Sequence, residues 1–124
     1  EADLSDHIYQ NPGLIEDGFR PLSREEHTKY GFLDVFGYDD NNNLVIIECK
    51  SNTANFNAVH QLKRYVDKMK KTKGLMKVRG IIAAPDITQN ARLLMNDFGF
   101  SFKAVEPPKK NRKFKKDQAS LLKF

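Results

Sequence analysis

The stretch GFLDVFGYDDNNNLVIIECKS, residues Gly31–Ser51, decides the fold because it contains two apolar runs separated by a polar segment. The runs Phe32–Tyr38 and Leu44–Lys50 are rich in β-branched and aromatic residues, which favour strands. The segment DDNNN between them consists of residue types that favour turns. We therefore expect the two runs to pair as an antiparallel β-hairpin.

This hairpin would place three charged side chains on one face. If the chain turns about Asn41, the numbers of paired residues sum to about 82, and Asp34 lies opposite Glu48 with Cβ atoms roughly 5 Å apart. Lys50 shares this face, because strand side chains alternate. The other face is apolar, so we expect Cys49 to be a small buried hydrophobe rather than a nucleophile. The core-facing set comprises Leu33, Val35, Val45, Ile47 and Cys49.

Two carboxylates this close in a half-buried sheet repel each other unless one takes up a proton or a cation lies between them. A divalent metal ion satisfies this requirement, and a ligand set made only of oxygens selects Mg²⁺ or Mn²⁺ over zinc. Lys50 is then placed to orient or deprotonate an attacking water and to offset charge on a phosphate group. The alternative is that Glu48 forms a surface ion pair with Lys50, opposite an unrelated Asp34.

The rest of the chain alternates helices with strands, which predicts an α/β fold: a mixed sheet with a central β-hairpin, flanked by helices. The segment NFNAVHQLKRYVDKMKKT, residues 55–72, carries apolar residues at helical spacing and basic residues on the opposite face. A helix over 88–98 is expected to end at Gly99, in the C-cap position. The other expected elements are a helix over 3–10 and strands over 77–84 and 100–105.

Length and composition indicate one small domain, since 124 residues of which 40% are hydrophobic can bury a core without disulfides or metals. No apolar run reaches the roughly 18 residues that cross a bilayer, and the first residues do not resemble a signal peptide, so we expect a soluble, cytoplasmic protein. The single cysteine excludes an internal disulfide, and His7, His27 and His60 do not combine with it at zinc-ligand spacing. The chain begins at Glu1 without Met, and we expect it to be a fragment of a longer protein.

The positive net charge of the chain comes from its C-terminal tail. Residues 1–105 hold 14 basic and 14 acidic residues, whereas residues 106–124 hold 7 and 2. The run KKNRKFKK, Lys109–Lys116, shows neither helical nor strand periodicity, which predicts a flexible linker. One interpretation is a solvated tail that aids solubility; the other is a salt-sensitive tether to phosphate backbone. The tether interpretation predicts DNA contacts by Lys109, Lys110, Arg112 and Lys113.

Two motifs together resemble those of a nuclease superfamily. Asp34, Glu48 and Lys50 follow the D…E-x-K order of the PD-(D/E)XK nucleases, and Gln61 and Tyr65 match the Q-x-x-x-Y motif of their RecB-like branch. The combination NPGLIEDGFRPL…GFLDVFG…LVIIECK…AVHQLKRYV is similar to the C-terminal catalytic domain of the EndoMS/NucS family of archaeal mismatch and branched-DNA endonucleases. This resemblance extends over nearly the whole chain and implies a restriction-endonuclease-like, RecB-like fold.

The resemblance also implies roles for individual residues. Asp34 and Glu48 would be ligands of Mg²⁺, with Mn²⁺ as a substitute, and the backbone carbonyl of Cys49 a third ligand. Lys50 would be the catalytic lysine, and Gln61 would act near the metal or the scissile phosphate.

Other residues match the family less directly. Glu16, in LIEDG, corresponds to the upstream acidic residue of RecB-like nucleases and would complete the metal shell. On the helix of residues 55–72, Lys63, Arg64 and Tyr65 are predicted to contact DNA. Tyr65 lies one turn after Gln61, and packing explains its position equally well.

The last seven residues, QASLLKF, resemble a sliding-clamp (PCNA) interaction box, with Gln118, Leu121 and Phe124 in the order Q-x-x-L-x-x-F. Such a peptide can form one tight turn that presents its apolar side chains to a groove. The expected organisation is a RecB-like nuclease domain over 1–106, a basic flexible linker over 107–117 and a clamp-binding motif over 118–124.

These observations lead to an expected function: a metal-dependent DNA endonuclease domain that cleaves mismatched or branched DNA and is recruited by a sliding clamp. The family also implies an N-terminal DNA-binding and dimerising domain, and hence a homodimer in the full-length protein. The alternatives are a Holliday-junction-resolvase-type nuclease and a catalytically silent DNA or clamp adaptor. The adaptor has no need for paired carboxylates beside a lysine.

Overall fold

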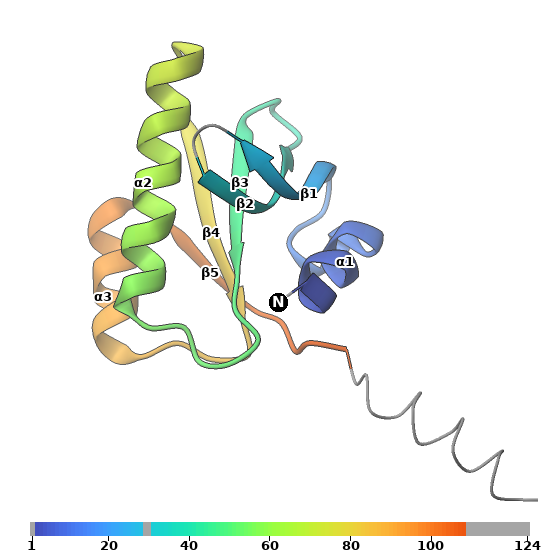
Figure 1. Ribbon diagram of the computed structural model, residues 1–124, viewed down its shortest axis with the longest axis vertical. Helices are drawn as coiled ribbons and strands as arrows, with labels where there is room; N and C mark the ends of the chain where they lie inside the picture. Colours follow the sequence, from blue (N-terminus) through green and yellow to red (C-terminus); the bar gives the residue numbers. More distant parts are fainter. Residues whose placement is uncertain (1, 29–30, 109–124) are drawn as a thin grey trace, which may run out of the picture.

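The computed structural model describes residues 2–28 and 31–108 (Figure 1). The side chains of residues 2, 23–28 and 31–34 are outside this description. The proposed linker from residue 109 onward and the whole clamp-binding motif also lie outside it. In chain order the elements are α1 (Ala2–Gln10), the 3₁₀ turn η1 (Pro12–Leu14), β1 (Arg20–Thr28), β2 (Gly31–Tyr38), β3 (Leu44–Cys49), α2 (Phe56–Lys73), β4 (Val78–Ala84), α3 (Gln89–Phe98) and β5 (Ser101–Ala104).

The five strands form one mixed sheet in the order β1-β2-β3-β4-β5. Strand β2 is antiparallel to both β1 and β3, whereas β3, β4 and β5 run parallel to one another. The predicted hairpin is confirmed, because Tyr38 pairs with Leu44 and Val35 pairs with Ile47, and the numbers in each pair sum to 82. Asn42, in the turn, has a φ of 62°, a left-handed conformation that asparagine adopts more readily than most residues.

The sequence-based prediction missed the strand β1. Its sequence, RPLSREEHT, is polar and contains a proline, so it lacks the apolar alternation that identifies a strand. The strand lies at the edge of the sheet, where polar residues and proline are tolerated. Its pairing with β2 shifts register between Pro21 and Ser23. The sheet therefore has one more strand than the sequence analysis predicted.

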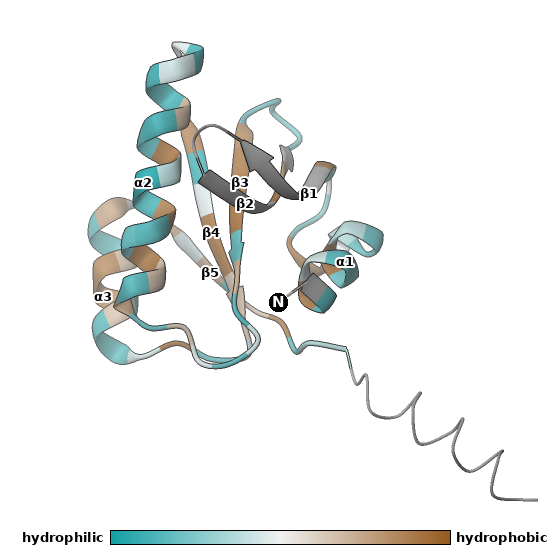
Figure 2. Cartoon of the chain, in the orientation of Figure 1, coloured by the Kyte–Doolittle hydropathy of each residue, from teal (hydrophilic) through white to brown (hydrophobic). Residues whose placement is uncertain are grey.

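Helices cover both faces of the sheet, with α2 and α3 on one side and α1 on the other (Figure 1). On β3, Leu44 and Ile46 belong to the apolar cluster under α2 and α3, whereas Val45 and Ile47 belong to the cluster under α1. Every residue of β3 is buried, and Figure 2 shows the hydrophobic colour along β3 and β4. The predicted core-facing set lies in the α1 cluster, except for Leu33, whose side chain is outside the described part: Val35, Val45, Ile47 and Cys49.

The helix boundaries follow local capping chemistry. The Asn55 side chain accepts a hydrogen bond from the Ala58 N–H at 3.3 Å and begins α2, which ends at Gly74 with a φ of 64°. Thr88 begins α3 in the same way, and Gly99 ends it with a φ of 75°, as predicted. None of the helices among the described residues is long and apolar enough to span a bilayer.

Candidate functional site

A buried carboxylate lies near the carboxyl end of the central strand β3. Glu48 is only 3% exposed. Because side chains alternate along a strand, Glu48 faces the same side as Leu44 and Ile46, which is the side covered by α2. A buried carboxylate is costly unless charged or polar partners compensate it. Its position among apolar neighbours therefore marks Glu48 as a candidate functional residue.

Lys50 lies beside this carboxylate, directly after β3. Its Nζ is 3.5 Å from Glu48 Oε2, and its side chain is 29% exposed whereas that of Glu48 is 4% exposed. The Lys50 N–H donates a hydrogen bond to the Ala83 carbonyl at 3.0 Å, which fixes the backbone at this point. The ion pair of the alternative interpretation is thus present, but its glutamate is buried rather than on the surface. The lysine is the solvent-facing member of the pair.

Asp34 lies in β2, one residue before Val35. Val35 pairs with Ile47, so continuing this register by one residue would set the backbones of Asp34 and Glu48 opposite each other. The Asp34 side chain is outside the described part of the structure, and its predicted pairing with Glu48 stays a prediction. Cys49 is fully buried with its side chain in the α1 cluster, as expected for a small hydrophobe. The role of its carbonyl as a ligand also stays a prediction.

Gln61 and Tyr65 form a pair on α2. The Gln61 Nε2 donates to the Tyr65 Oη at 3.0 Å. Tyr65 is 8% exposed and belongs to the core cluster with Ala58, which precedes Gln61 by three residues on the same side of the helix. The structure therefore supports packing as the role of Tyr65, with its hydroxyl holding the Gln61 amide on the helix side that faces the sheet.

The two basic residues predicted to contact DNA from α2 have different surroundings. Lys63 Nζ lies 2.7 Å from Asp67 Oδ2 and 5.3 Å from the centroid of the Phe98 ring, so it is directed toward α3. Arg64 is exposed. Of the two, Arg64 is the more accessible to a partner.

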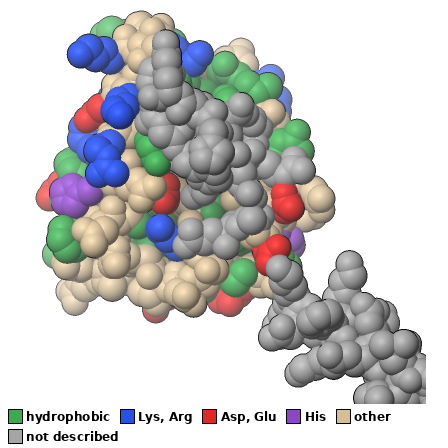
Figure 3. Space-filling view, in the orientation of Figure 1, with side chains coloured by type: hydrophobic (Ala, Val, Ile, Leu, Met, Phe, Trp, Pro, Cys, Tyr) green, Lys and Arg blue, Asp and Glu red, His purple; other side chains and the backbone are tan. Residues whose placement is uncertain are grey.

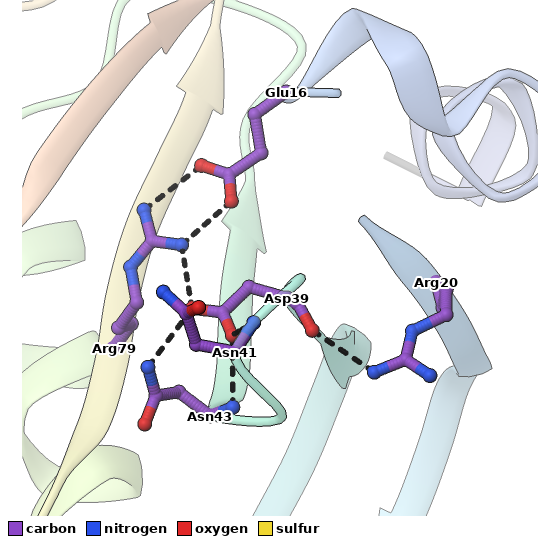
Figure 4. Close-up of polar contacts among 6 residues, drawn as sticks. All are labelled: Glu16, Arg20, Asp39, Asn41, Asn43 and Arg79. Carbon is purple, nitrogen blue, oxygen red and sulfur yellow. Dashed lines mark hydrogen bonds and ion pairs between the residues drawn. The ribbon is translucent and has the colours of Figure 1, made fainter. Parts of the chain in front are cut away.

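The structure does not bring Glu16 to Glu48. Arg79 binds both oxygens of Glu16, with Nη1–Oε2 and Nη2–Oε1 distances of 2.7 and 2.9 Å (Figure 4). Arg79 lies on β4 opposite Val45 and alternates with Val78, so it faces the α1 side of the sheet. Glu48 faces the α2 side. The loop after α1 follows its helix onto the α1 face, and Glu16 therefore does not complete a metal shell with Glu48.

The sequence analysis missed the ionic network to which Glu16 belongs. Arg79 Nη1 also donates to Asp39 Oδ2 at 3.1 Å, and Asp39 Oδ1 accepts from the N–H groups of Asn41 and Asn43 at 2.9 and 2.8 Å. Arg20 Nη2 donates to the Asp39 carbonyl at 2.9 Å (Figure 4). The network thus joins the β2–β3 turn to β4 and to the loop that follows α1. Two signals in the sequence were available: the aspartate that opens DDNNN, and the arginine within the apolar run KVRGIIAA.

The charges of this network are stabilised as ions. Hydrogen bonds from Arg79 lower the pKa of Glu16 below its ordinary value, although burial acts in the opposite direction. Burial raises the pKa of Asp39, but hydrogen bonds from Asn43, Arg79 and Asn41 outweigh it and leave the pKa lowered. The hydrogen bonds to Glu16 raise the pKa of Arg79. All three groups are therefore charged at neutral pH.

Among the described side chains, no three histidines, cysteines or acidic residues lie close enough together to hold a metal ion. The Asp34 carboxylate is not among these side chains. The described members of the predicted ligand set are the Glu48 carboxylate and the Cys49 backbone carbonyl, which both offer oxygen atoms.

Comparisons with known proteins agree with this architecture. The family model for the endonuclease NucS C-terminal domain matches residues 1–122. The endonuclease NucS of Pyrococcus furiosus is 46% identical over 121 residues, which cover 98% of this chain and 45% of that protein. The crystal structure of a repair endonuclease from Pyrococcus abyssi is similar with a TM-score of 0.82 and 41% identity, covering 86% of this chain and 47% of that one.

A structure of an EndoMS–dsDNA2 complex is similar with a TM-score of 0.83 and 40% identity, covering 88% of this chain and 45% of that one. These similarities confirm the predicted fold class, a mixed sheet flanked by helices. The chain spans about half the length of the curated relatives it matches.

Proposed function

The chain belongs to the family of endonuclease NucS C-terminal domains, and from this premise we propose that it hydrolyses phosphodiester bonds in mismatched or branched DNA with the aid of a divalent metal ion. The observation that carries this proposal is the buried Glu48 carboxylate with Lys50 Nζ 3.5 Å away, near the end of β3. A buried acid beside a partly exposed lysine offers a charged site on an otherwise apolar strand.

The donors present fit a hard cation. Asp34, Glu48 and the backbone carbonyl of Cys49 would hold the ion, and such an all-oxygen set suits Mg²⁺, with Mn²⁺ as a substitute. When bound, the metal polarises the phosphate and makes a coordinated water more acidic. The contribution of Glu48 is to supply negative charge from a position where water is largely excluded.

Lys50 and Gln61 would act on the phosphate and on the attacking water. The Lys50 ammonium is held near Glu48 but retains 29% exposure, so it can donate hydrogen bonds to a phosphate at the surface and offset its developing charge. Gln61 is restrained by its 3.0 Å hydrogen bond to Tyr65, so its amide has a defined position on α2. These two side chains position the reactants without needing to form covalent bonds with them.

DNA binding by the domain would involve Arg64 and Lys63 on α2, together with the basic run of the tail. A duplex is the appropriate substrate to test, because the similar EndoMS structure is a complex with dsDNA. Mismatch choice and homodimer formation are proposed for a longer protein, since the chain spans about half of its relatives.

The test is cleavage of end-labelled DNA by the 124-residue chain in Mg²⁺, Mn²⁺ or EDTA. The substrates are a duplex with a G·T mismatch, the matched duplex, a branched flap and a four-way junction. We expect metal-dependent cleavage of the mismatched or branched DNA, and none in EDTA. Preferential cutting of the four-way junction would favour a resolvase. Binding without cleavage of any substrate in either metal would favour the silent adaptor and contradict the proposal.

We further propose that the C-terminal motif binds a PCNA-type sliding clamp. Phe124→Ala should weaken clamp binding at least about tenfold, because a buried aromatic anchor typically contributes more than 1.4 kcal/mol. Isothermal titration of clamp into the chain measures this change. Lys123→Ala is the matched control, since it alters a neighbouring position outside the Q-x-x-L-x-x-F pattern. Equal clamp affinity in the Phe124 variant and the unmodified chain would eliminate the motif, while clamp-independent cleavage should be unchanged in both variants.

A further inference from the structure

Basic residues are concentrated in one segment of the domain. Residues 63–79 contain eight lysines and arginines and a single acidic residue, Asp67. The other 88 residues between 1 and 105 contain six basic and thirteen acidic residues. The domain is therefore neutral as a whole up to Val105 but strongly polarised. Its positive charge lies on α2 and the turn that leads into β4.

Five basic residues of this segment are exposed, and we call this set the α2–β4 basic surface: Arg64, Lys68, Lys71, Lys73 and Lys77. Arg64, Lys68 and Lys71 are spaced by four and three residues and so lie on one side of α2. Figure 3 shows blue side chains gathered over the part of the molecule that α2 occupies. Asp67 does not neutralise this surface, because Lys63 engages it at 2.7 Å.

Helix stability explains only part of this charge. Lysines in the last turn of α2, including Lys71 and Lys73, interact favourably with the helix dipole. Arg64 and Lys68 precede the last turn, and Lys77 follows the helix. Among the described residues, no ion pair or hydrogen bond of these side chains holds them to another part of the domain. These like charges repel one another, and binding of a polyanionic partner explains better why they are gathered here.

We propose that the α2–β4 basic surface binds the phosphodiester backbone of duplex DNA away from the cleavage site. The proposal rests on the proposed function, in which Gln61 on the same helix acts close to the scissile phosphate. From Gln61 to Lys71 the helix advances by about 15 Å, at roughly 1.5 Å per residue. This length corresponds to about four base pairs of duplex at roughly 3.4 Å each. The surface thus extends the binding site along the DNA and gives affinity that does not depend on sequence.

The test compares two variants that each lose two positive charges. Lys68→Gln/Lys71→Gln alters the α2–β4 basic surface, and Arg92→Gln/Lys103→Gln alters exposed residues elsewhere in the domain. Binding of a fluorescent duplex is measured in EDTA, so that no cleavage occurs, over a series of salt concentrations. The slope of log K against log salt should fall in magnitude by about two in the first variant, since each lost phosphate contact removes about one. The control variant should keep the slope of the unmodified chain.

Other results separate this proposal from its alternatives. Lys68→Arg/Lys71→Arg should restore the slope, because charge rather than side-chain shape sets it. An unchanged slope in Lys68→Gln/Lys71→Gln, or the same change in the control variant, would show a merely solvated surface and overturn the proposal. The proposal would also be overturned if Lys68→Gln/Lys71→Gln bound a labelled polyglutamate peptide more weakly than the unmodified chain but bound DNA equally well. That result would indicate an acidic protein partner.

Cleavage in Mg²⁺, assayed separately, keeps this proposal distinct from the proposed function. If the unmodified chain cleaves no DNA but its duplex binding depends on Lys68 and Lys71, the surface assignment stands and the nuclease proposal fails. If the chain cleaves DNA while the Lys68→Gln/Lys71→Gln variant keeps its salt slope, the nuclease proposal stands and the surface assignment is wrong.

Discussion

Glu48→Gln is expected to abolish metal-dependent DNA cleavage, lowering kcat by about 10³-fold or more, with little loss of duplex binding. Glutamine keeps the shape of the side chain but removes its negative charge, so it is a poor ligand for Mg²⁺ and no longer attracts Lys50. The fold should survive, because the substitution also removes the cost of burying a carboxylate that is only 3% exposed. Activity and thermal stability should therefore separate in this variant.

Three measurements establish that separation. Single-turnover cleavage in Mg²⁺ gives the rate, anisotropy in EDTA gives duplex affinity, and thermal unfolding followed by circular dichroism gives stability. Asp97→Asn is the matched control, since it neutralises an exposed carboxylate on α3 and should leave the cleavage rate within about twofold. Titration with Mn²⁺ in the absence of DNA should show weaker metal binding for Glu48→Gln than for the control. Undiminished cleavage by Glu48→Gln would remove the proposed metal site.

The sequence predicted the hairpin and its register because both depend on local chemistry. Turn residues in DDNNN place the turn, and alternation in the two flanking runs favours a pairing that buries Val35, Val45 and Ile47 together. The same alternation placed Glu48 and Lys50 on one side of the strand, where the structure has them 3.5 Å apart. The polar strand β1 carries no such pattern, since an edge strand does not need one.

The misplacement of Glu16 and the missed role of Arg79 share a cause, which is that both depend on contacts between distant parts of the chain. Glu16 and Arg79 are 63 residues apart in sequence and meet only when the loop after α1 packs near β4. No local pattern indicates on which face of the sheet that loop lies. Tyr65 is an intermediate case: its position on the helix allowed packing or DNA contact, and burial among core residues supports packing.

Arg79→Met is expected to destabilise the fold by about 2–3 kcal/mol at pH 7, as measured by urea denaturation. Methionine retains much of the apolar stem but leaves Glu16 and Asp39 without the cation that separates them. The value lies below the range for fully buried pairs, because the Arg79 side chain is 26% exposed and solvent screens part of the interaction. Arg92→Met, at an exposed arginine on α3 whose guanidinium lies 5.3 Å from the centroid of the Phe102 ring, is the control and should change stability by at most about 1 kcal/mol.

The destabilisation by Arg79→Met should be larger at neutral pH than in acid. The pKa values of Glu16 and Asp39 are lowered in the folded chain, so their stabilising contribution is present above their ordinary values and is lost as the pH falls through the folded values. In Arg79→Met the two carboxylates repel each other at pH 7 and are relieved by protonation. The difference between variant and unmodified chain should therefore be largest near neutral pH and smaller at about pH 3, which is below the ordinary pKa values of both carboxyl groups.

An equal loss of stability at both pH values would mean that Arg79 acts through the packing of its stem and not through its ion pairs. Cleavage provides an independent check on where the network lies. Because Arg79 faces the α1 side of the sheet and Glu48 faces the α2 side, Arg79→Met should keep its cleavage rate at temperatures where it remains folded. Glu48→Gln should show the reverse, with stability retained and cleavage lost. Opposite outcomes from two charged residues on neighbouring strands would assign stabilisation of the hairpin to one face of the sheet and catalysis to the other.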